Sequence, residues 1–190
     1  LRWDEGERHL LVAPERCLSP AELGAPRAFG VSAQLYSLKT REPDPIGDFG
    51  DLTVAAELAA GRGADLFGLS PLHALFMADA NARSPYSPSH RAFVNPLYVD
   101  VPLAAERLGL PRPASVPEGP ELLDYPALAA MKTATLETLF AAFQARGGDP
   151  DFIRFRGAGG RALDNHCRFE ALHEASLAQE RVDLARLEKA

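Results

Sequence analysis

The sequence predicts an α/β fold in which a strand, a helix and a second strand form one unit, followed by a helical region. Residues 31–38 alternate between two faces, as strands do. Residues 48–63 open with a capping pattern and continue with apolar residues at helical spacing, and residues 66–72 form a short apolar run. Because such runs suit buried parallel strands, the unit belongs to a parallel sheet or barrel.

The chain divides into three regions. Its 190 residues can form one good core or two small ones. We expect a hairpin and linker at 1–27, the strand–helix–strand region at 28–102 and a helical region at 103–190. Two short apolar runs around residues 4–7 indicate a hairpin with its turn there. Two strands alone are marginal in water, so we expect this hairpin to belong to a sheet whose other strands lie upstream of residue 1.

The central region has clear start and stop signals. Aspartate is a preferred N-cap residue, and Asp51 follows Asp48 at the spacing of a capping box, so the helix should begin at Asp48. Glycine favours helix ends, which places the end at Gly61 or Gly63. In the preceding strand, one face should carry Val31, Ala33, Leu35 and Ser37.

The third region should form three helices after a proline-rich lead-in. Asp124 precedes the first helix, which should end at residues 147–148. Its apolar residues fall near one stripe: Leu128, Met131, Leu139 and Phe143. A short second helix opens at Pro150 and should end in a glycine-rich loop at 157–160, and the last helix begins near Leu163.

Composition excludes several classes of function. With 20 basic and 26 acidic residues the net charge is −6, so we expect no nucleic-acid partner. No apolar stretch approaches the roughly 18 residues that cross a bilayer, and no signal-peptide pattern opens the chain, so we expect no membrane partner. Cys17 and Cys167 are far apart, which suggests reduced thiols in a cytoplasmic protein. His166, Cys167 and His173 lack the spacing of metal ligands, so we expect no metal or cofactor.

Residues 70–100 are the richest in chemistry. They follow a predicted buried strand, where α/β folds place their binding loops. Within them, Tyr86 lies between the hydroxyls of Ser84 and Ser87, on a segment stiffened by two prolines. An aromatic ring can lie against the apolar face of a sugar while hydroxyls bond its edge. The same residue types also form ordinary turns, so the pattern alone leaves both interpretations open.

Other candidate side chains have competing interpretations. Asp48 and Asp51 could be the paired carboxylates of a glycosidase, but their position at a helix start favours capping. His73 follows the second strand and could contact a substrate or be held by loop backbone. We find no nucleophile elbow and no Cys–His pairing that would indicate a nucleophile.

Four segments, in one order, extend this interpretation: FGVSAQLYSL (29–38), IGDFGDL (46–52), GLSPLHALF (68–76) and SPYSPSHRAFVNPLYVDV (84–101). Together they resemble the bacterial 4-α-glucanotransferases, the amylomaltases or disproportionating enzymes of glycoside hydrolase family 77. Residues 124–132 and 169–174 resemble the helical insertion of that family. Residues 10–17 are similar to the end of its extra N-terminal β domain.

The resemblance implies that this chain is an incomplete piece of a (β/α)8 barrel enzyme. Residues 28–102 would supply the first strands and helix of the barrel, 103–190 a helical insertion subdomain, and 1–27 a remnant of the N-terminal β domain. The implied reaction transfers a segment of an α-1,4-glucan or maltooligosaccharide to a new acceptor with retained configuration. Retention uses an aspartate nucleophile and a glutamate acid/base, which in the family lie on later strands, so no catalytic carboxylate is expected in this chain.

The resemblance also assigns roles to individual residues. Ser84 and Tyr86 match family positions that contact the glucan near the acceptor side, and His73 and Asn95 match further family motifs. Two alternatives from other classes stay open: a stand-alone carbohydrate-binding or regulatory fragment without catalysis, and part of an amylase-like or debranching hydrolase. One fold hosts several chemistries, so the motifs alone do not separate transfer from hydrolysis.

Overall fold

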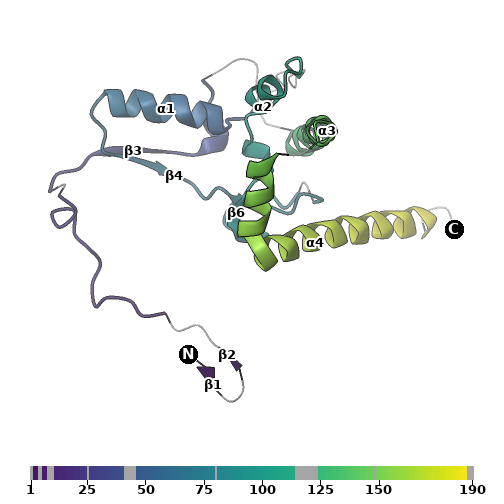
Figure 1. Cartoon of the computed structure of the whole chain (residues 1–190), viewed down its shortest axis with the longest axis horizontal. Coiled ribbons are helices and arrows are strands. Elements are labelled where there is room, and N and C mark those ends of the chain that lie inside the picture. The colour runs from purple at the N-terminus through teal and green to yellow at the C-terminus, as the bar shows by residue number, and fades with distance from the viewer. Residues whose placement is uncertain are drawn as a thin grey trace.

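The molecule consists of small sheets and long helices joined by extended segments (Figure 1). The computed structural model describes residues 2–3, 6–7, 11–24, 26–40, 46–79, 81–113, 124–147 and 149–187. In this part of the chain three separate two-stranded sheets form, and they do not close a barrel. The predicted α/β class is confirmed, since one of these sheets is a parallel strand–helix–strand unit.

The N-terminal hairpin lies apart from the other elements in Figure 1. Strand β1 (Arg2–Trp3) pairs antiparallel with β2 (Gly6–Glu7). The predicted hairpin is confirmed, but its turn is shorter than predicted because Gly6 and Glu7 are themselves paired strand residues.

The following segment contains no helix or strand among its described residues up to Gly30. Side-chain hydrogen bonds to Glu22 order part of this segment. The Glu22 carboxylate accepts hydrogen bonds from Arg16 at 2.6 and 2.8 Å and from the Ser19 amide at 2.8 Å. The Arg16 guanidinium, aided by Ser19, lowers the pKa of Glu22 to about 2. Both members of the ion pair face solvent, so the pair orders the turn locally and adds little to global stability.

The central unit has the predicted order. Strand β3 (Gly30–Ala33) leads to α1 (Phe49–Gly61) and then to β4 (Leu66–Leu69). The two strands are parallel, with Gly30 opposite Leu66. Both are shorter than predicted.

Strand β3 ends early because the chain turns Leu35 into the core. A short 3₁₀ helix, η1 (Leu35–Ser37), replaces the predicted second half of the strand, and Leu35 is fully buried. Gly47 packs against this turn and donates its amide to the Tyr36 carbonyl at 3.3 Å. A Cβ at Gly47 would lie 2.1 Å from the carbonyl oxygens of Leu35 and Leu38, so only glycine fits. The predicted alternation of faces over 34–38 is therefore wrong.

The predicted capping box of α1 is confirmed. The Asp48 carboxylate accepts the amides of Gly50 and Asp51 at 2.8 and 3.0 Å, and the Asp51 carboxylate accepts the Asp48 amide at 3.1 Å. Thr40 adds its amide and hydroxyl to Asp51, which ties the preceding segment to the helix start. Both carboxylates are buried, so the box satisfies donors that water cannot reach.

A second hairpin, which the sequence did not predict, follows the central unit. Strand β5 (His73–Ala74) pairs antiparallel with β6 (His90–Val94), and the register shifts between its two residues. We call the intervening residues 75–89 the β5–β6 connection. The segment after β4, which was predicted to be a loop, therefore contains two paired strands and the long connection between them.

The next elements begin at side-chain caps. The 3₁₀ helix η2 (Pro96–Tyr98) is capped by Asn95, α2 (Val101–Arg107) by Asp100 and α3 (Tyr125–Ala145) by Asp124. The predicted start of α3 and its end before Gly147 are confirmed. The predicted α3 stripe is confirmed too, since its four apolar residues are all buried or half-buried.

Two small cores hold these elements together. The first contains Leu35, Ile46, Tyr98 and Leu128 and therefore joins η1, η2 and α3. The second joins α2 to α3 through Val101, Ala105 and Leu139.

Helix α4 (Pro150–Leu187) consists of two helical stretches that meet at a kink at Gly160, so the two helices predicted there are confirmed. The predicted loop at 157–160 is wrong for most of its length, because residues 157–159 are helical. Only Gly160 leaves the helical conformation, with φ 49° and ψ −145°, and it bends the helix sharply (Figure 1). Beyond the bend α4 first packs beside β6 and then extends away from the rest of the molecule toward the C-terminus (Figure 1).

Candidate functional site

The predicted sugar-binding segment lies on the β5–β6 connection. Ser89 closes the connection at its base: its amide donates to the Ala74 carbonyl at 2.8 Å, and its hydroxyl lies 3.2 and 3.1 Å from the carbonyls of Ala74 and Leu75. The two ends of the connection are therefore held together where β5 ends and β6 begins.

Ser84 and Tyr86 share one exposed turn on this connection. The Ser87 amide donates to the Ser84 carbonyl at 3.1 Å, which closes a four-residue turn. Tyr86 is 71% exposed, so its side chain is available for contact with a ligand. Both sequence interpretations, a stiff turn and a presented aromatic ring, describe this geometry.

His73 and Asn95 lie together at the other end of the strand pair. His73 is half-buried opposite Val94, and the Asn95 amide donates to the Leu72 carbonyl at 2.9 Å. Asn95 is 1% exposed, and its Oδ1 accepts the Leu97 amide at 3.0 Å to cap η2. Its Nδ2 makes no hydrogen bond of good geometry with the described residues. The structure thus gives Asn95 a capping task that the sequence analysis did not foresee.

Helix α3 supports this end of the site with two residues that the sequence analysis missed. The buried Lys132 ammonium donates to the carbonyls of Leu97 and Val99 at 2.7 and 3.3 Å, which fixes the chain just after Asn95. Burial raises the pKa of Tyr125, although the neighbouring Asn95 amide and the Arg83 guanidinium oppose the rise. Arg83 directly precedes Ser84, so α3 lies close to the start of the exposed turn.

Helix α4 contributes a cluster of aromatic and titratable side chains that was not predicted from the sequence. We define the α4–β6 cluster by its aromatic and titratable residues: Phe76, His90, Phe93, His166, Phe169, Glu170 and His173. His166 stacks on Phe93 with ring centroids 4.7 Å apart and lies 5.2 Å from the His90 ring. Glu170 accepts the Met77 amide at 3.3 Å.

The electrostatics of this cluster centre on His166. Burial lowers its pKa, Glu170 raises it and His90 lowers it further, so the net direction is downward. His166 Nδ1 lies 3.8 Å from Glu170 Oε1, and neither this oxygen nor His173 Nδ1 has a hydrogen-bond partner among the described residues. The i, i+4 spacing of His166 and Glu170 indicates that the two side chains lie on one face of the helix. The sequence did not show that this face packs against β6, because β6 itself was not predicted.

The buried carboxylates of the described chain serve as caps. Asp48 and Asp51 form the capping box of α1, and the Asp100 carboxylate accepts the Leu103 amide at 2.9 Å at the start of α2. The structural interpretation of Asp48 and Asp51 is therefore confirmed over the glycosidase pair. In the described residues no group of three or more His, Cys, Asp or Glu is placed to hold a metal ion.

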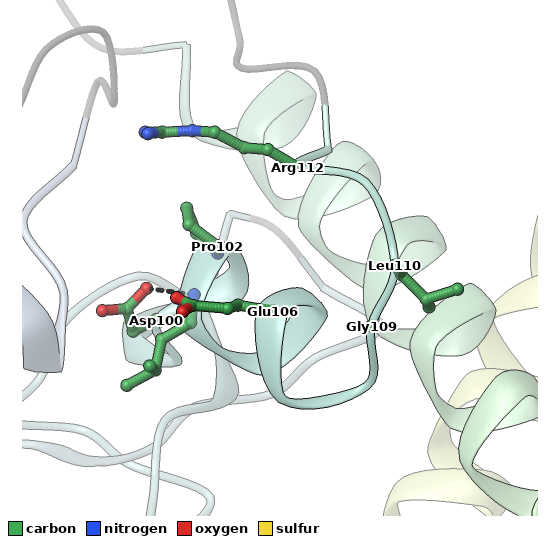
Figure 2. Close-up of a pocket in the computed structure, with 7 residues that line it drawn as sticks. Asp100, Pro102, Glu106, Gly109, Leu110 and Arg112 are labelled. Atoms are coloured by element: carbon green, nitrogen blue, oxygen red, sulfur yellow. Dashed lines mark hydrogen bonds between the residues drawn. The ribbon is translucent and has the colours of Figure 1, made fainter.

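A shallow hollow beside α2 contains none of the predicted site residues. Figure 2 shows Asp100, Pro102, Glu106 and Arg112 around it, while Leu110 points away toward a neighbouring helix. Leu110 packs on the second core, which explains its direction.

Cys17 and Cys167 are both exposed and form no disulfide. In the part of the chain that the structure describes, no helix is long and apolar enough to cross a membrane.

Comparisons with known proteins agree on one family. A family model described as 4-alpha-glucanotransferase, of glycoside hydrolase family 77, matches residues 33–186. The 4-alpha-glucanotransferase of Haemophilus influenzae is 36% identical over 147 residues, covering 71% of this chain and 21% of the relative. That of Mycobacterium tuberculosis is 32% identical over 182 residues, covering 87% of this chain and 25% of the relative. The chain thus spans about a quarter or less of the curated relatives it matches.

Proposed function

Because this chain belongs to the 4-alpha-glucanotransferase family, we propose that it is part of an enzyme that transfers a segment of an α-1,4-glucan to glucose or to another α-1,4-glucan. The family fold is a TIM-like barrel, and in this proposal β3, α1 and β4 are its first strand, helix and strand. The observation that carries the proposal is the family match over residues 33–186, which includes the whole β5–β6 connection.

The proposed chemistry retains the configuration of the sugar. A carboxylate nucleophile forms a covalent glycosyl-enzyme, and a second carboxyl group about 5–5.5 Å away acts first as acid and then as base. We assign neither role to a residue of this chain, because its buried described carboxylates Asp48, Asp51 and Asp100 already accept backbone amides at helix starts. The two catalytic carboxylates would come from another part of the barrel.

The part that this chain plays is substrate binding. Tyr86 offers an exposed ring to the apolar face of a glucose unit near the acceptor side, and the Ser84 hydroxyl offers a hydrogen bond to its edge. His73, half-buried at the far end of the strand pair, is a further candidate contact. Asn95, deeply buried as a cap, would act by shaping the chain around His73 or through its side-chain amide, which lies beside Tyr125. The two free thiols fit a cytoplasmic enzyme, which stays a prediction.

The experiment is incubation of the complete gene product with maltotriose, followed by chromatography of the products. Transfer yields glucose together with oligosaccharides longer than maltotriose, because each piece removed is rejoined to another sugar. Glucose and maltose without any longer product would show a hydrolase instead. Maltotriose that binds but stays unchanged would point to a carbohydrate-binding module and overturn the proposal.

A further inference from the structure

The β5–β6 connection is held by contacts from outside its own strands. Ser89 fixes its closing end, whereas among the described residues the exposed turn from Ser84 to Ser87 is closed by its own backbone hydrogen bond. The position of the Ser84 hydroxyl and the Tyr86 ring therefore depends on how the opening half of the connection is anchored.

Two helices anchor that opening half. From α4, Phe169 and His173 pack edge-on against Phe76, with ring centroids 6.1 and 5.4 Å apart. From α3, Tyr125 and Ala129 line a small cavity against the same stretch. Among the described residues, the hydrogen bond that joins these helices to this stretch is the one that the Met77 amide donates to Glu170 at 3.3 Å.

Glu170 is an unusual residue to find in such a place. Its side chain is only 19% exposed, and its Oε1 has no hydrogen-bond partner among the described residues. Burying a carboxylate with an unsatisfied oxygen costs free energy, so an apolar residue would pack α4 more favourably. Unlike an apolar side chain, a carboxylate at this position lies 3.8 Å from His166 through Oε1 and accepts the Met77 amide.

We propose that Glu170 is a positioning residue: by accepting the Met77 amide it fixes the opening half of the β5–β6 connection and thereby aligns Ser84 and Tyr86 for the acceptor sugar. The alignment of the sugar contacts rests on the proposed function, whereas the anchoring of the connection does not. Glu170 acts through Met77 and needs no contact with the glucan itself.

The first test is hydrogen exchange of the complete gene product in three variants. Glu170→Ala should accelerate exchange of the Met77 amide about tenfold, since a lost hydrogen bond to a charged group of about 1.4 kcal/mol is tenfold in equilibrium. Glu170→Gln keeps an acceptor oxygen and should stay close to the unsubstituted protein. Glu174→Ala, one turn further along α4 and exposed, is the matched control and should change nothing at Met77. Unchanged exchange in Glu170→Ala would overturn the proposal.

The second test measures transfer to glucose with the same variants. Glu170→Ala should raise the acceptor KM by roughly three- to tenfold while changing kcat less than about twofold, because binding geometry is lost and the catalytic carboxylates are untouched. Glu170→Gln should restore the KM. Faster Met77 exchange with an unchanged KM, or a Gln variant as defective as Ala, would refute the alignment of Ser84 and Tyr86. If the unsubstituted protein transfers no sugar, the proposed function fails, and the exchange comparison still decides the anchoring.

Discussion

At the scale of single residues, Tyr86 shows how one side chain can satisfy two interpretations of its sequence. The turn is closed by the backbone bond between Ser87 and Ser84, and the Tyr86 ring takes no part in that bond. A residue that is 71% exposed has buried little apolar surface, so its side chain contributes little to the stability of the fold. Its removal should therefore leave the turn intact, which makes Tyr86 a clean test of sugar contact.

We expect Tyr86→Ala to lower the catalytic efficiency of transfer about tenfold in the complete gene product. The reason is the loss of an aromatic contact of about 0.5–1.5 kcal/mol beyond its buried area, and 1.36 kcal/mol is tenfold in rate. Tyr86→Phe keeps the ring and loses only the hydroxyl, so its defect should be smaller. The measurement is kcat/KM at varied acceptor concentration. A lower melting temperature with an unchanged acceptor dependence would remove Tyr86 from the binding site.

At the scale of elements, features set by neighbouring residues could be predicted from the sequence, whereas features set by contacts between distant residues could not. The start of α1 could be predicted from Asp48 and Asp51, because a capping box involves only four consecutive residues. The end of β3 did not follow from its sequence, since it depends on burying Leu35 against Ile46 and α3. The pairing of β5 with β6 was hidden because the two strands are separated by a connection rich in serine and proline.

The same contrast explains the candidate site. Ser84 and Tyr86 were proposed as sugar contacts from their residue types together with the family resemblance, and this role stays a prediction. Lys132 and Glu170 were missed because their roles lie in contacts to Leu97 and Met77, 35 and 93 positions away in the chain. No pattern within one helix reports on such a contact.

The bend in α4 gives a prediction with an internal control. Gly160 has φ 49° and ψ −145°, a region that only glycine occupies without strain, so Gly160→Ala should destabilise the bend by about 1–3 kcal/mol. Gly157 is helical with open space around its Cβ position, so Gly157→Ala should stabilise the same helix by about 1 kcal/mol. Hydrogen exchange of α4 amides on both sides of residue 160 should speed up in the first variant and slow down in the second. Equal effects would show that the bend does not depend on Gly160.

Contact between α4 and β6 should weaken in acid. The pKa of His166 lies below its ordinary value of 6.5, chiefly because of burial and then through His90, with Glu170 opposing. The folded state therefore binds fewer protons than the unfolded state, and its stability is complete above about pH 6.5 and declines as the pH falls through and below that value. Among the described residues, the titratable groups that face His166 are His90 from β6 and Glu170 from α4 itself.

The measurement is an NMR titration of the His166 ring. We expect its midpoint below that of a free histidine, a higher midpoint in His90→Phe and a lower one in Glu170→Gln. His166→Phe, which keeps the stacking on Phe93, should flatten the acid dependence of α4 packing. A midpoint at or above the ordinary value would contradict the buried environment of this ring.

At the scale of the whole molecule, the described elements leave much apolar surface uncovered. The chain exposes 14072 Å², whereas a compact protein of 20.5 kDa exposes about 8,900 Å². Large apolar side chains face solvent on the parallel sheet and its approach and on α4: Phe29, Val31, Leu66, Ile153, Phe155 and Leu172. In Figure 1 the N-terminal hairpin and the far half of α4 extend away from the two small cores. Surface of this kind is typical of protein that packs against further structure.

The last prediction follows from that surface and concerns residues 1–190 expressed alone. Two cores of four and three buried residues cannot offset the conformational entropy of so long a chain, so thermal unfolding should be broad and the protein should bind hydrophobic dyes before heating. The unpaired edges of β3 and β4 should promote association at high concentration. With maltotriose, the isolated chain should release no glucose above a blank, since its buried described carboxylates are committed to helix caps. A sharp cooperative transition from a monomer would contradict the first expectation, and released glucose would place catalytic carboxylates within this chain.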